Sequence, residues 1–424
     1  MNRPPEHVVV VGASLGGMSL AQELRRIGYD GAVTVIGAER TRAHYDRTQL
    51  SKDLLTGRCE PDSLYLMDEE ETARLALDLR TGRRATGLRT GAGTQAPAPA
   101  LVPALAPTSA LALALDDGTT VEADAVVIAS GSSARRPPFP ADLPGVHTLR
   151  TVDDAVALRT AMADAKDVVV LGAGFIGCEV AAAARATGRD VTLVDLQPAP
   201  MYAALGPVVG DHFARLHRAN GTRLELGTGV AGLVGDHRVT GVRLADGRVL
   251  GADLVVIGFG GVPETGWLDG SGVAVDNGVV CDDAGRTAVP GVFALGDAAR
   301  WHSARHGRPV RSEHWNHVPL QAEVVAENLV AGALSAADTP AARLDALPSF
   351  WTDQFGSRTQ LVGTPSPGDL THIVAGTPGE PGLVALYTRD GRTTAALAVD
   401  APRALLRHRD RVTEGAPWPP ADTF

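Results

Sequence analysis

At 424 residues the chain exceeds the roughly 250–300 residues at which one hydrophobic core stops growing, so we expect two or three domains. Its 39 basic and 49 acidic residues give a net charge of −10, which repels nucleic-acid backbones and argues against a nucleic-acid partner. The cysteines, Cys59, Cys178 and Cys281, lie far apart, so we expect no disulfide framework and no metal site, and a cytoplasmic location fits best.

The first predicted element is an apolar strand that starts at residue 8, with no room before it for a signal peptide. It runs into the glycine turn GASLGG (residues 12–17) and a helix-forming stretch, an arrangement whose helix amides hold a diphosphate. Glu39 follows the next predicted strand, where an acid accepts hydrogen bonds from a ribose. An ordinary glycine turn is the alternative, because Ser14 replaces the second glycine of GxGxxG.

The chain contains only two lysines, Lys52 and Lys166, among its 39 basic residues. Where arginine is so strongly preferred, a lysine marks a position at which the compact ammonium is needed. Chance survival of a surface lysine is the alternative interpretation.

An Ala/Pro-rich stretch over residues 96–115 carries no charge, and its length alone would allow a membrane span. Four prolines, at positions 97, 99, 103 and 107, would break a helix there. We therefore expect a surface insertion near residues 91–110 that leads into a strand, and no membrane association.

A pattern of strand, glycine turn, helix, hairpin and closing strand occurs twice. VVVVGASLGG (8–17) is matched by VVVLGAGFIG (168–177), and ADAVVIASG, ending at Gly131, is matched by ADLVVIGFG, ending at Gly260. A hairpin signal precedes each closing strand. We therefore predict an α/β fold with two doubly wound, Rossmann-like dinucleotide-binding units.

The second glycine turn, GAGFIG (172–177), is a complete GxGxxG between a predicted strand and helix. Asp195 ends the following strand, 18 residues after Gly177, where it is expected to hold an adenosine ribose. A carboxylate at that point repels a 2′-phosphate, so NAD is expected over NADP. A solvated acid at a strand end is the alternative.

The remaining elements complete the predicted organisation. VPGVFALGD (289–297) reads as a short strand ending in Gly-Asp that returns to the first unit, followed by a helix from near Pro319. Beyond about residue 340, short strands with an Asp390-Gly391 turn predict a small C-terminal α+β domain. The expected domains are 1–150 with 266–335, then 151–265, then 336–424.

Two glycine turns and the Gly-Asp strand resemble the two-dinucleotide flavoproteins of the glutathione reductase superfamily. The segments YDR (45–47), LSK (50–52), EHW (313–315) and FWTDQFG (350–356) narrow the resemblance to the putidaredoxin reductase-like, NADH-dependent ferredoxin reductases of bacterial oxygenase systems, especially the actinobacterial type. The chain departs from that pattern at Thr48 and Gln49, where two prolines are usual, and at Ser130.

The resemblance implies FAD and NADH as cofactors and no metal. The implied FAD-binding residues are Gly12, Ser14, Leu15, Gly16, Gly17, Glu39, Arg47, Lys52, Ser130, Gly131, Gly296, Asp297, His314 and Trp315. The implied NAD-binding residues are Gly172, Gly174, Phe175, Ile176, Gly177, Asp195 and Gly260.

The resemblance also implies three catalytic residues: Lys52, Glu179 and Trp315. Lys52 is expected near the reactive nitrogen of the flavin, paired with Glu179, and Trp315 at the flavin edge. A structural ion pair and a packed indole are the alternatives. The helix near Pro319 is expected to direct its amides toward the flavin.

The chain has no CxxxxC pair, so electrons are expected to leave the flavin for an external acceptor. The resemblance implies a small iron–sulfur ferredoxin, which supplies a haem-thiolate monooxygenase, and a monomer or homodimer. Arg305, Arg308 and Arg311 are candidates for docking it, with a solvated loop as the alternative. The competing functions are an NADH oxidase or quinone reductase, and a flavoprotein whose redox state controls partner binding.

Overall fold

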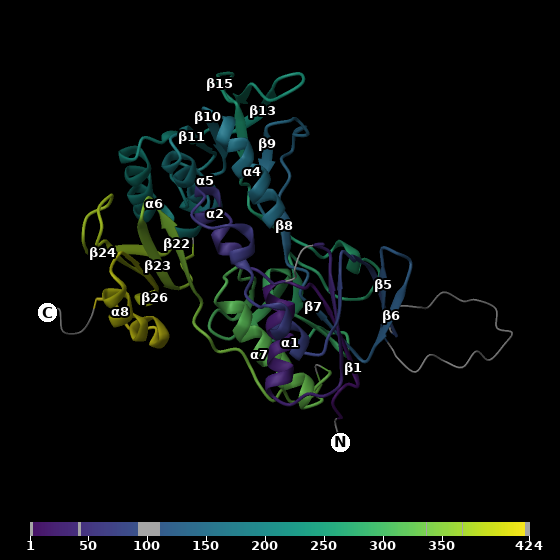
Figure 1. The fold of residues 1–424 in the computed structure, drawn as a ribbon. Helices are drawn as coiled ribbons and strands as arrows, with labels where there is room; N and C mark the ends of the chain where they lie inside the picture. Colours follow the sequence, from purple (N-terminus) through teal and green to yellow (C-terminus); the bar gives the residue numbers. More distant parts are fainter. Residues whose placement is uncertain (1–2, 41–43, 92–110, 336, 367, 420–424) are drawn as a thin grey trace. The chain divides into compact units, whose positions relative to one another are not determined.

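The computed structural model describes residues 3–40, 44–91, 111–335, 337–366 and 368–419 (Figure 1). It divides into two compact units: unit 1 comprises Met1–Asp46, Tyr65–Ser133 and Val262–Ala346, and unit 2 comprises Arg47–Leu64, Ala134–Gly261 and Leu347–Phe424. The chain passes between the units within β8 (Ser132–Ala134) and β17 (Gly261–Pro263). The three domains expected from the sequence stay a prediction. The insertion expected near residues 91–110 lies, beyond residue 91, outside the described residues.

Unit 1 is built on a five-stranded parallel sheet. In spatial order its strands are β19 (Val292–Ala294), β7 (Ala125–Ile128), β1 (His7–Val11), β2 (Ala32–Gly37) and β3 (Asp78–Thr81). The central strands are runs of valine and isoleucine because both faces of a parallel sheet are covered. The strand predicted within residues 289–297 does return to this sheet, as β19.

Helices and smaller strands complete unit 1. They are α1 (Leu15–Arg26), α3 (Glu69–Arg74), α7 (His317–Val330), the antiparallel β4 (Ala85–Thr90), β5 (Leu111–Leu115) and β6 (Thr120–Ala123), and the sheet of β18 (Val279–Cys281), β20 (Ala299–Ser303) and β21 (Arg308–Val310). Helices α1 and α7 pack against each other (Figure 1). One continuous apolar core joins α1, α7 and the strands β4, β5, β6, β18 and β20 to the parallel sheet.

Unit 2 contains a parallel sheet of the same design. Its spatial order is β12 (Arg223–Leu226), β11 (Asp190–Asp195), β10 (Asp167–Leu171), β16 (Leu254–Ile257) and β9 (Val146–Thr148). The order β16-β10-β11-β12 matches β7-β1-β2-β3 of unit 1, and an antiparallel sheet precedes each closing strand: β13 (Val230–Val234), β14 (Gly241–Leu244) and β15 (Val249–Gly251) here. The predicted repeat is confirmed.

The helices of this part of unit 2 are α2 (Asp53–Thr56), α4 (Val152–Asp164), α5 (Phe175–Ala186) and α6 (Tyr202–Ala219). Alanines dominate the middle of α5, and their small side chains let this buried helix pack closely on its neighbours. Helix α5 lies against α2 and also against the first strand of the C-terminal sheet. It therefore brings residues from three distant parts of the chain together.

The C-terminal part of unit 2 is an antiparallel sheet with one covering helix. Its strands, in spatial order, are β22 (Ser349–Gln354), β23 (Ser357–Gly363), β26 (Arg392–Val399), β25 (Val384–Arg389) and β24 (Leu370–Ala375), and the helix is α8 (Pro402–Glu414). Asp390 and Gly391 both have positive φ and close the β25–β26 hairpin, as their sequence predicts. Apolar residues of β23, β25, β26 and α8 form the core of this part.

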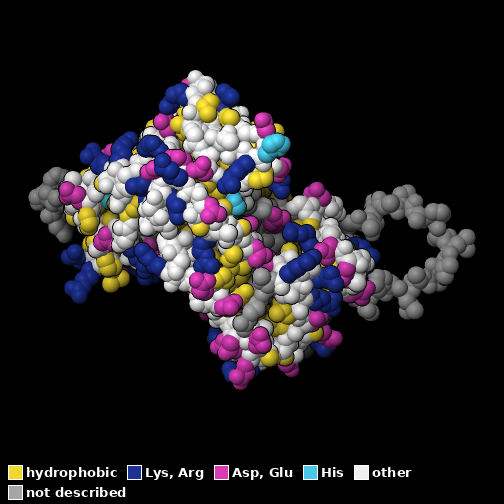
Figure 2. All heavy atoms as spheres, turned by 45° about the horizontal axis from the view of Figure 1, so that its top comes forward, with side chains coloured by type: hydrophobic (Ala, Val, Ile, Leu, Met, Phe, Trp, Pro, Cys, Tyr) yellow, Lys and Arg dark blue, Asp and Glu magenta, His cyan; other side chains and the backbone are white. Residues whose placement is uncertain are grey.

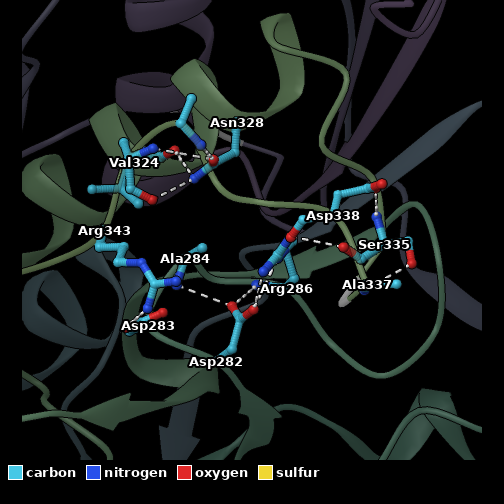
Figure 3. Close-up of polar contacts among 12 residues, drawn as sticks. Asp282, Asp283, Ala284, Arg286, Val324, Asn328, Ser335, Ala337, Asp338 and Arg343 are labelled. Carbon is cyan, nitrogen blue, oxygen red and sulfur yellow. Dashed lines mark hydrogen bonds and ion pairs between the residues drawn. The ribbon is translucent and has the colours of Figure 1, made fainter. Parts of the chain in front are cut away.

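A buried arginine holds the segment that follows α7 in unit 1 (Figure 3). The Arg286 side chain, which is only 4% exposed, pairs with Asp282 and donates hydrogen bonds to the backbone carbonyls of Ser335 and Asp338, each at 2.7 Å. Asn328 of α7 bonds the same segment through its side-chain amide. These contacts fasten the polypeptide that leads from α7 toward the C-terminal sheet.

The surface carries a mixture of basic and acidic side chains, as expected from the similar numbers of the two in the sequence. Figure 2 shows basic and acidic side chains interspersed over one face of the described part of the chain. Across the described ranges, every helix is too short or too polar to cross a membrane.

Candidate functional site

The two glycine turns have the same backbone construction. A Cβ on Gly12 would lie 2.0 Å from the carbonyl oxygen of Ala129, and one on Gly172 would lie 2.3 Å from that of Gly258. A Cβ on Gly17 or Gly177 would fall within 2 Å of the carbonyl oxygen of Gly12 or Gly172, respectively. The first and last glycines are therefore required by contacts between the strand, the turn and the helix.

The middle position of each turn is different. A Cβ on Gly174 would have no atom within 4 Å, so the fold itself does not demand glycine there. This explains how Ser14 can occupy the equivalent position in unit 1. Neither α1 nor α5 has a side-chain cap at its N-terminus, and in unit 2 the open middle position adjoins the amides that a diphosphate would use.

The acids at the strand ends lie beside these turns. Asp195, at the end of β11, accepts hydrogen bonds from the backbone amides of Ala173 at 2.5 Å and Gln197 at 2.7 Å, which fixes its carboxylate next to the turn of unit 2. Glu39 follows β2 and accepts a 2.6 Å hydrogen bond from the hydroxyl of Tyr45. The sequence indicated the two acids, and the structure supplies the groups that orient them.

Two further contacts organise the Gly-Asp turn of unit 1. The hydroxyl of Ser132 donates to Asp297 at 3.0 Å, and the amide of Gly296 donates to Gln321 of α7 at 2.8 Å. Ser130, one residue before Gly131, donates to the carbonyl of Glu264 at 2.7 Å. Ser132 and Gln321 were not among the predicted site residues, since a lone serine and a buried glutamine carry no motif.

The segment before α7 contains His314, and α7 itself begins with His317. Burial lowers the pKa of His314 to about 4, with His317 adding to the effect, so its imidazole is neutral at physiological pH. Trp315 lies between them and is half-buried. Helix α7 begins at His317, two residues before the expected Pro319, and has no acidic side chain in its first turn. The roles of His314 and Trp315 stay predictions.

The remaining candidates lie as follows. In unit 2, the ring of Phe175 contacts Phe350 edge-on at 4.6 Å between centroids, and Ile176 is exposed beside it. Gly260 has a φ of 88°, and its carbonyl accepts the amide of Arg135. Arg47 is also in unit 2 and donates to the carbonyl of Arg150 at 2.9 Å, whereas Leu15 and Gly16 belong to the first turn of α1 in unit 1.

The lysine singled out by its rarity is paired in unit 2. The ammonium of Lys52, just before α2, lies 3.3 Å from the carboxylate of Glu179 on α5, and the two side chains are 10% and 5% exposed. The hydroxyls of Ser51 and Thr352 donate to the two Glu179 oxygens at 2.5 and 2.7 Å. Burial raises the pKa of Glu179, while the Lys52 charge and these hydrogen bonds oppose that rise.

A second acid and an aromatic ring complete the surroundings of Lys52. Asp353 lies 3.8 Å from the ammonium and is itself held by Arg358 through two hydrogen bonds of 2.6 and 3.0 Å. The ring of Trp351 lies 5.7 Å from the ammonium, within range of a cation–π contact. Trp351 and Asp353 belong to the FWTDQFG motif (350–356), but the sequence did not predict that they lie beside Lys52.

The three thiols are poorly suited to redox chemistry. All are free, and Cys178 and Cys281 are buried. Burial raises the pKa of each thiol, including that of half-buried Cys59, whereas a reactive cysteine needs a lowered pKa. Within the described ranges, no group of three or more His, Cys, Asp or Glu side chains is placed to hold a metal ion.

The site residues fit two dinucleotides. Each unit presents helix amides without a side-chain cap and an oriented acid after the next strand, and unit 2 also has an open middle position in its glycine turn. These are the donors and acceptors that a diphosphate and a ribose require. Both units therefore fit a dinucleotide.

Comparisons with known proteins agree. The family model of pyridine nucleotide-disulphide oxidoreductases matches residues 6–319, and the reductase C-terminal model matches residues 349–424. The ferredoxin reductase component of chlorobenzene dioxygenase from Cupriavidus sp. (strain PS12) is 38% identical over 400 residues, which cover 94% of this chain and 90% of that protein. Rhodocoxin reductase from Rhodococcus erythropolis is 32% identical over 422 residues, covering 98% and 92%.

Among solved structures, the covalent complex of putidaredoxin reductase with putidaredoxin matches with a TM-score of 0.86 at 30% sequence identity, covering 97% of this chain and 94% of that chain. The family model and these relatives span nearly all of the sequence. The chain therefore belongs to the pyridine nucleotide-disulphide oxidoreductase family, as a flavoprotein that uses FAD and NAD(H) and carries the reductase C-terminal domain.

Proposed function

We propose that this protein is an NADH-dependent ferredoxin reductase that supplies electrons to an oxygenase. The observation that carries the proposal is the combination of two dinucleotide turns with three thiols whose pKa values are all raised. We propose that NADH reduces FAD in this protein and that, with no cysteine suited to pass electrons on, the acceptor is external. The names of the relatives, which are ferredoxin reductases, agree with this conclusion.

FAD would be held by the turn at residues 12–17, by Glu39 and by the Gly296–Asp297 turn with Ser132 and Gln321 behind it. NADH would be held by the turn at residues 172–177, with Asp195 on its ribose. When bound, FAD supplies the conversion of a hydride into two single electrons. The protein contributes binding, orientation and charge.

Lys52 contributes the charge in this proposal. From the resemblance we propose that its ammonium acts near the flavin, where a positive charge stabilises added electron density. Glu179 and Asp353 hold the ammonium in a fixed place, so the charge is positioned before any reaction. A guanidinium is planar and longer, and would not fit between these two carboxylates in the same way.

We further propose the finer features that the resemblance implies. The electron acceptor is a small iron–sulfur ferredoxin, and the final oxygenase is a haem-thiolate monooxygenase. The protein acts in the cytoplasm, where its three free thiols stay reduced, as a monomer or homodimer. Arg305, before β21, and Arg308, the first residue of β21, are exposed, which supports a docking role for an acidic partner, whereas Arg311 pairs with Glu313.

An anaerobic titration tests the proposal. NADH is added to the purified, FAD-loaded protein while the visible flavin bands are followed, and a two-iron ferredoxin is then added. We expect bleaching by NADH and reoxidation that depends on the ferredoxin.

Three outcomes would contradict the proposal. No flavin bands after FAD is supplied would refute the cofactor assignment. Reoxidation by oxygen or quinone without acceleration by several ferredoxins would identify an oxidase or quinone reductase. Slow turnover with every acceptor, together with NADH-dependent association, would identify a redox-controlled binding protein.

A further inference from the structure

We infer that Thr352 and Gln354 are positioning residues for the Lys52–Glu179 pair, an inference that rests on the proposed function of Lys52. They lie two residues apart on β22 and so share one face of the strand. Both side chains are buried in unit 2. Neither was expected to belong to the site.

A continuous chain of buried side chains leads to Glu179. The hydroxyl of Thr352 donates to Glu179 at 2.7 Å, and the side-chain amide of Gln354 donates to Thr352 at 3.1 Å. The carbonyl of Gln354 lies 3.1 Å from Nε2 of His217 on α6, whose Nδ1 lies 3.4 Å from the hydroxyl of Thr222. This series of hydrogen bonds thus connects α6 to the ion pair through β22.

Each hydrogen bond in this chain has one possible direction. Glu179, as a carboxylate, only accepts, so Thr352 must donate to it and accept from the Gln354 amide. The carbonyl of Gln354 then accepts, so Nε2 of His217 carries the proton. Burial lowers the pKa of His217 to about 4, hence the ring is neutral and its Nδ1 accepts from Thr222. Every donor therefore points toward Glu179.

This direction matters for the ion pair. Thr352 donates to Oε1 of Glu179, the oxygen that also lies 3.3 Å from the Lys52 ammonium, while Ser51 donates to the other oxygen. The two hydroxyls hold the carboxylate from both sides. Without Thr352, only the Lys52 ammonium remains on Oε1, and the carboxylate is free to rotate about the Ser51 hydrogen bond.

The small number of lysines in the protein allows the effect of Thr352 on the Lys52 ammonium to be measured directly. Because Lys52 and Lys166 are its only lysines, the full-length, FAD-loaded protein made with ¹³Cε,¹⁵Nζ-lysine gives two side-chain NMR signals. A Lys166→Arg variant assigns them, and exposed Lys166 serves as the internal reference. We expect Thr352→Val to move the Lys52 signal, Gln354→Leu to move it less, and Thr352→Ser to leave it near its original position.

Stopped-flow reduction of the flavin by NADH is the second readout. We expect Thr352→Val to slow flavin reduction at saturating NADH by about tenfold, which corresponds to one hydrogen bond to a charged group. The Kd of NADH from the same titration should not change, and Thr352→Ser should restore the rate. The matched control is Thr393→Val, which removes a buried hydroxyl that donates to the carbonyl of Ala416 in the same sheet. It should leave both readouts unchanged.

The outcomes separate this inference from the proposed function. An unmoved Lys52 signal in Thr352→Val overturns the inference, as does a moved signal with an unchanged rate of flavin reduction. If Thr393→Val slows flavin reduction as much as Thr352→Val, the effect is general destabilisation and the inference is also wrong. A wild-type protein that is reduced by NADH but does not transfer electrons to ferredoxin refutes the proposed acceptor and leaves the positioning result standing.

Discussion

The ammonium of Lys52 lies 3.3 Å from the carboxylate of Glu179, although one residue precedes a short helix and the other lies on the helix that follows the second glycine turn. Glu179 is thus one turn of helix beyond the amides proposed to bind NADH. The same helix that would hold the electron donor also holds the counter-ion of the lysine. The turn proposed to bind NADH and the partner of Lys52 therefore belong to one helix of unit 2.

Replacing Lys52 by methionine should retain FAD and slow flavin reduction by NADH about 10- to 100-fold. The substitution removes the positive charge and leaves Glu179 as a buried carboxylate without its cation, a change that costs several kcal/mol in other proteins. Stopped-flow reduction under anaerobic conditions measures the rate. Lys166→Met, at the other lysine, should behave as wild type. An unchanged rate in Lys52→Met would leave the ion pair with only a structural role.

Asp195→Ser should narrow the preference for NADH over NADPH by roughly tenfold. The change removes the negative charge that disfavours a 2′-phosphate, and it also removes the acceptor of the Ala173 amide. The ratio of kcat/KM values for the two nucleotides measures the preference. Asp190→Ser, at the exposed start of the same strand, is the control. If the ratio does not move, the ribose is held elsewhere.

The middle and last glycines of the second turn, Gly174 and Gly177, should respond differently to alanine. A methyl group on Gly177 would overlap the carbonyl of Gly172, so Gly177→Ala should lower the Tm by several degrees. Gly174 has open space and a φ of −74°, so Gly174→Ala should keep the Tm but raise the KM for NADH several-fold, because the methyl group would stand where the diphosphate approaches the amides. An unaltered KM would place the diphosphate away from this turn.

Stability should fall in mild acid because of His217. Its pKa is lowered to about 4 in the folded protein, against about 6.5 when unfolded. The unfolded chain therefore binds a proton that the native chain does not, so stability present above pH 6.5 is lost as the pH falls toward 4. This group alone contributes about 2 kcal/mol of loss between pH 6.5 and 5.

The measurement compares wild type with His217→Gln by thermal unfolding at pH 7 and pH 5. The variant should be less stable at pH 7, and the gap should narrow at pH 5. His44 and His314, whose pKa values are also lowered to about 4 by burial, are present in both proteins and cancel from the comparison. A gap that stays constant with pH would mean that His217 does not titrate in this range.

The repeated strand, turn and helix pattern predicted most of the fold because both parallel sheets depend on local features: buried valine runs and glycines that the backbone itself requires. The same repeated pattern also predicted the closing strand of each parallel sheet and the strand β19, which rejoins the sheet of unit 1. Glu39 and Asp195 could be found by their spacing from the glycines. The valine runs, the glycines and the spacing of the acids can each be recognised within one short stretch of sequence.

The surroundings of Lys52 could not be predicted in the same way. Ser51 stood out in the sequence only because it precedes Lys52. Thr352, Asp353 and Gln354 reach the site because β22 packs against α5. His217 joins through α6. Such contacts depend on which faces of distant elements meet, and a threonine or glutamine within a strand carries no sign of its partner.

Arg286→Lys should destabilise unit 1 by about 2–4 kcal/mol, although it keeps the charge. The buried guanidinium pairs with Asp282 and donates to two backbone carbonyls, and an ammonium on a flexible stem cannot reproduce that planar set of donors (Figure 3). Two carbonyls would then lose their donor, at a cost of about 1–3 kcal/mol for each one that stays buried.

Arg343 offers a matched control in the same part of the molecule. Its side chain is 60% exposed and pairs with Asp283 at 2.7 Å, so Arg343→Lys should change stability by less than about 0.5 kcal/mol. Thermal unfolding of the FAD-loaded protein, followed by flavin fluorescence, compares the two variants. Because Arg286 fastens the segment after α7, its variant should release flavin at a lower temperature, whereas equal release temperatures would show that the segment is held mainly by Asn328.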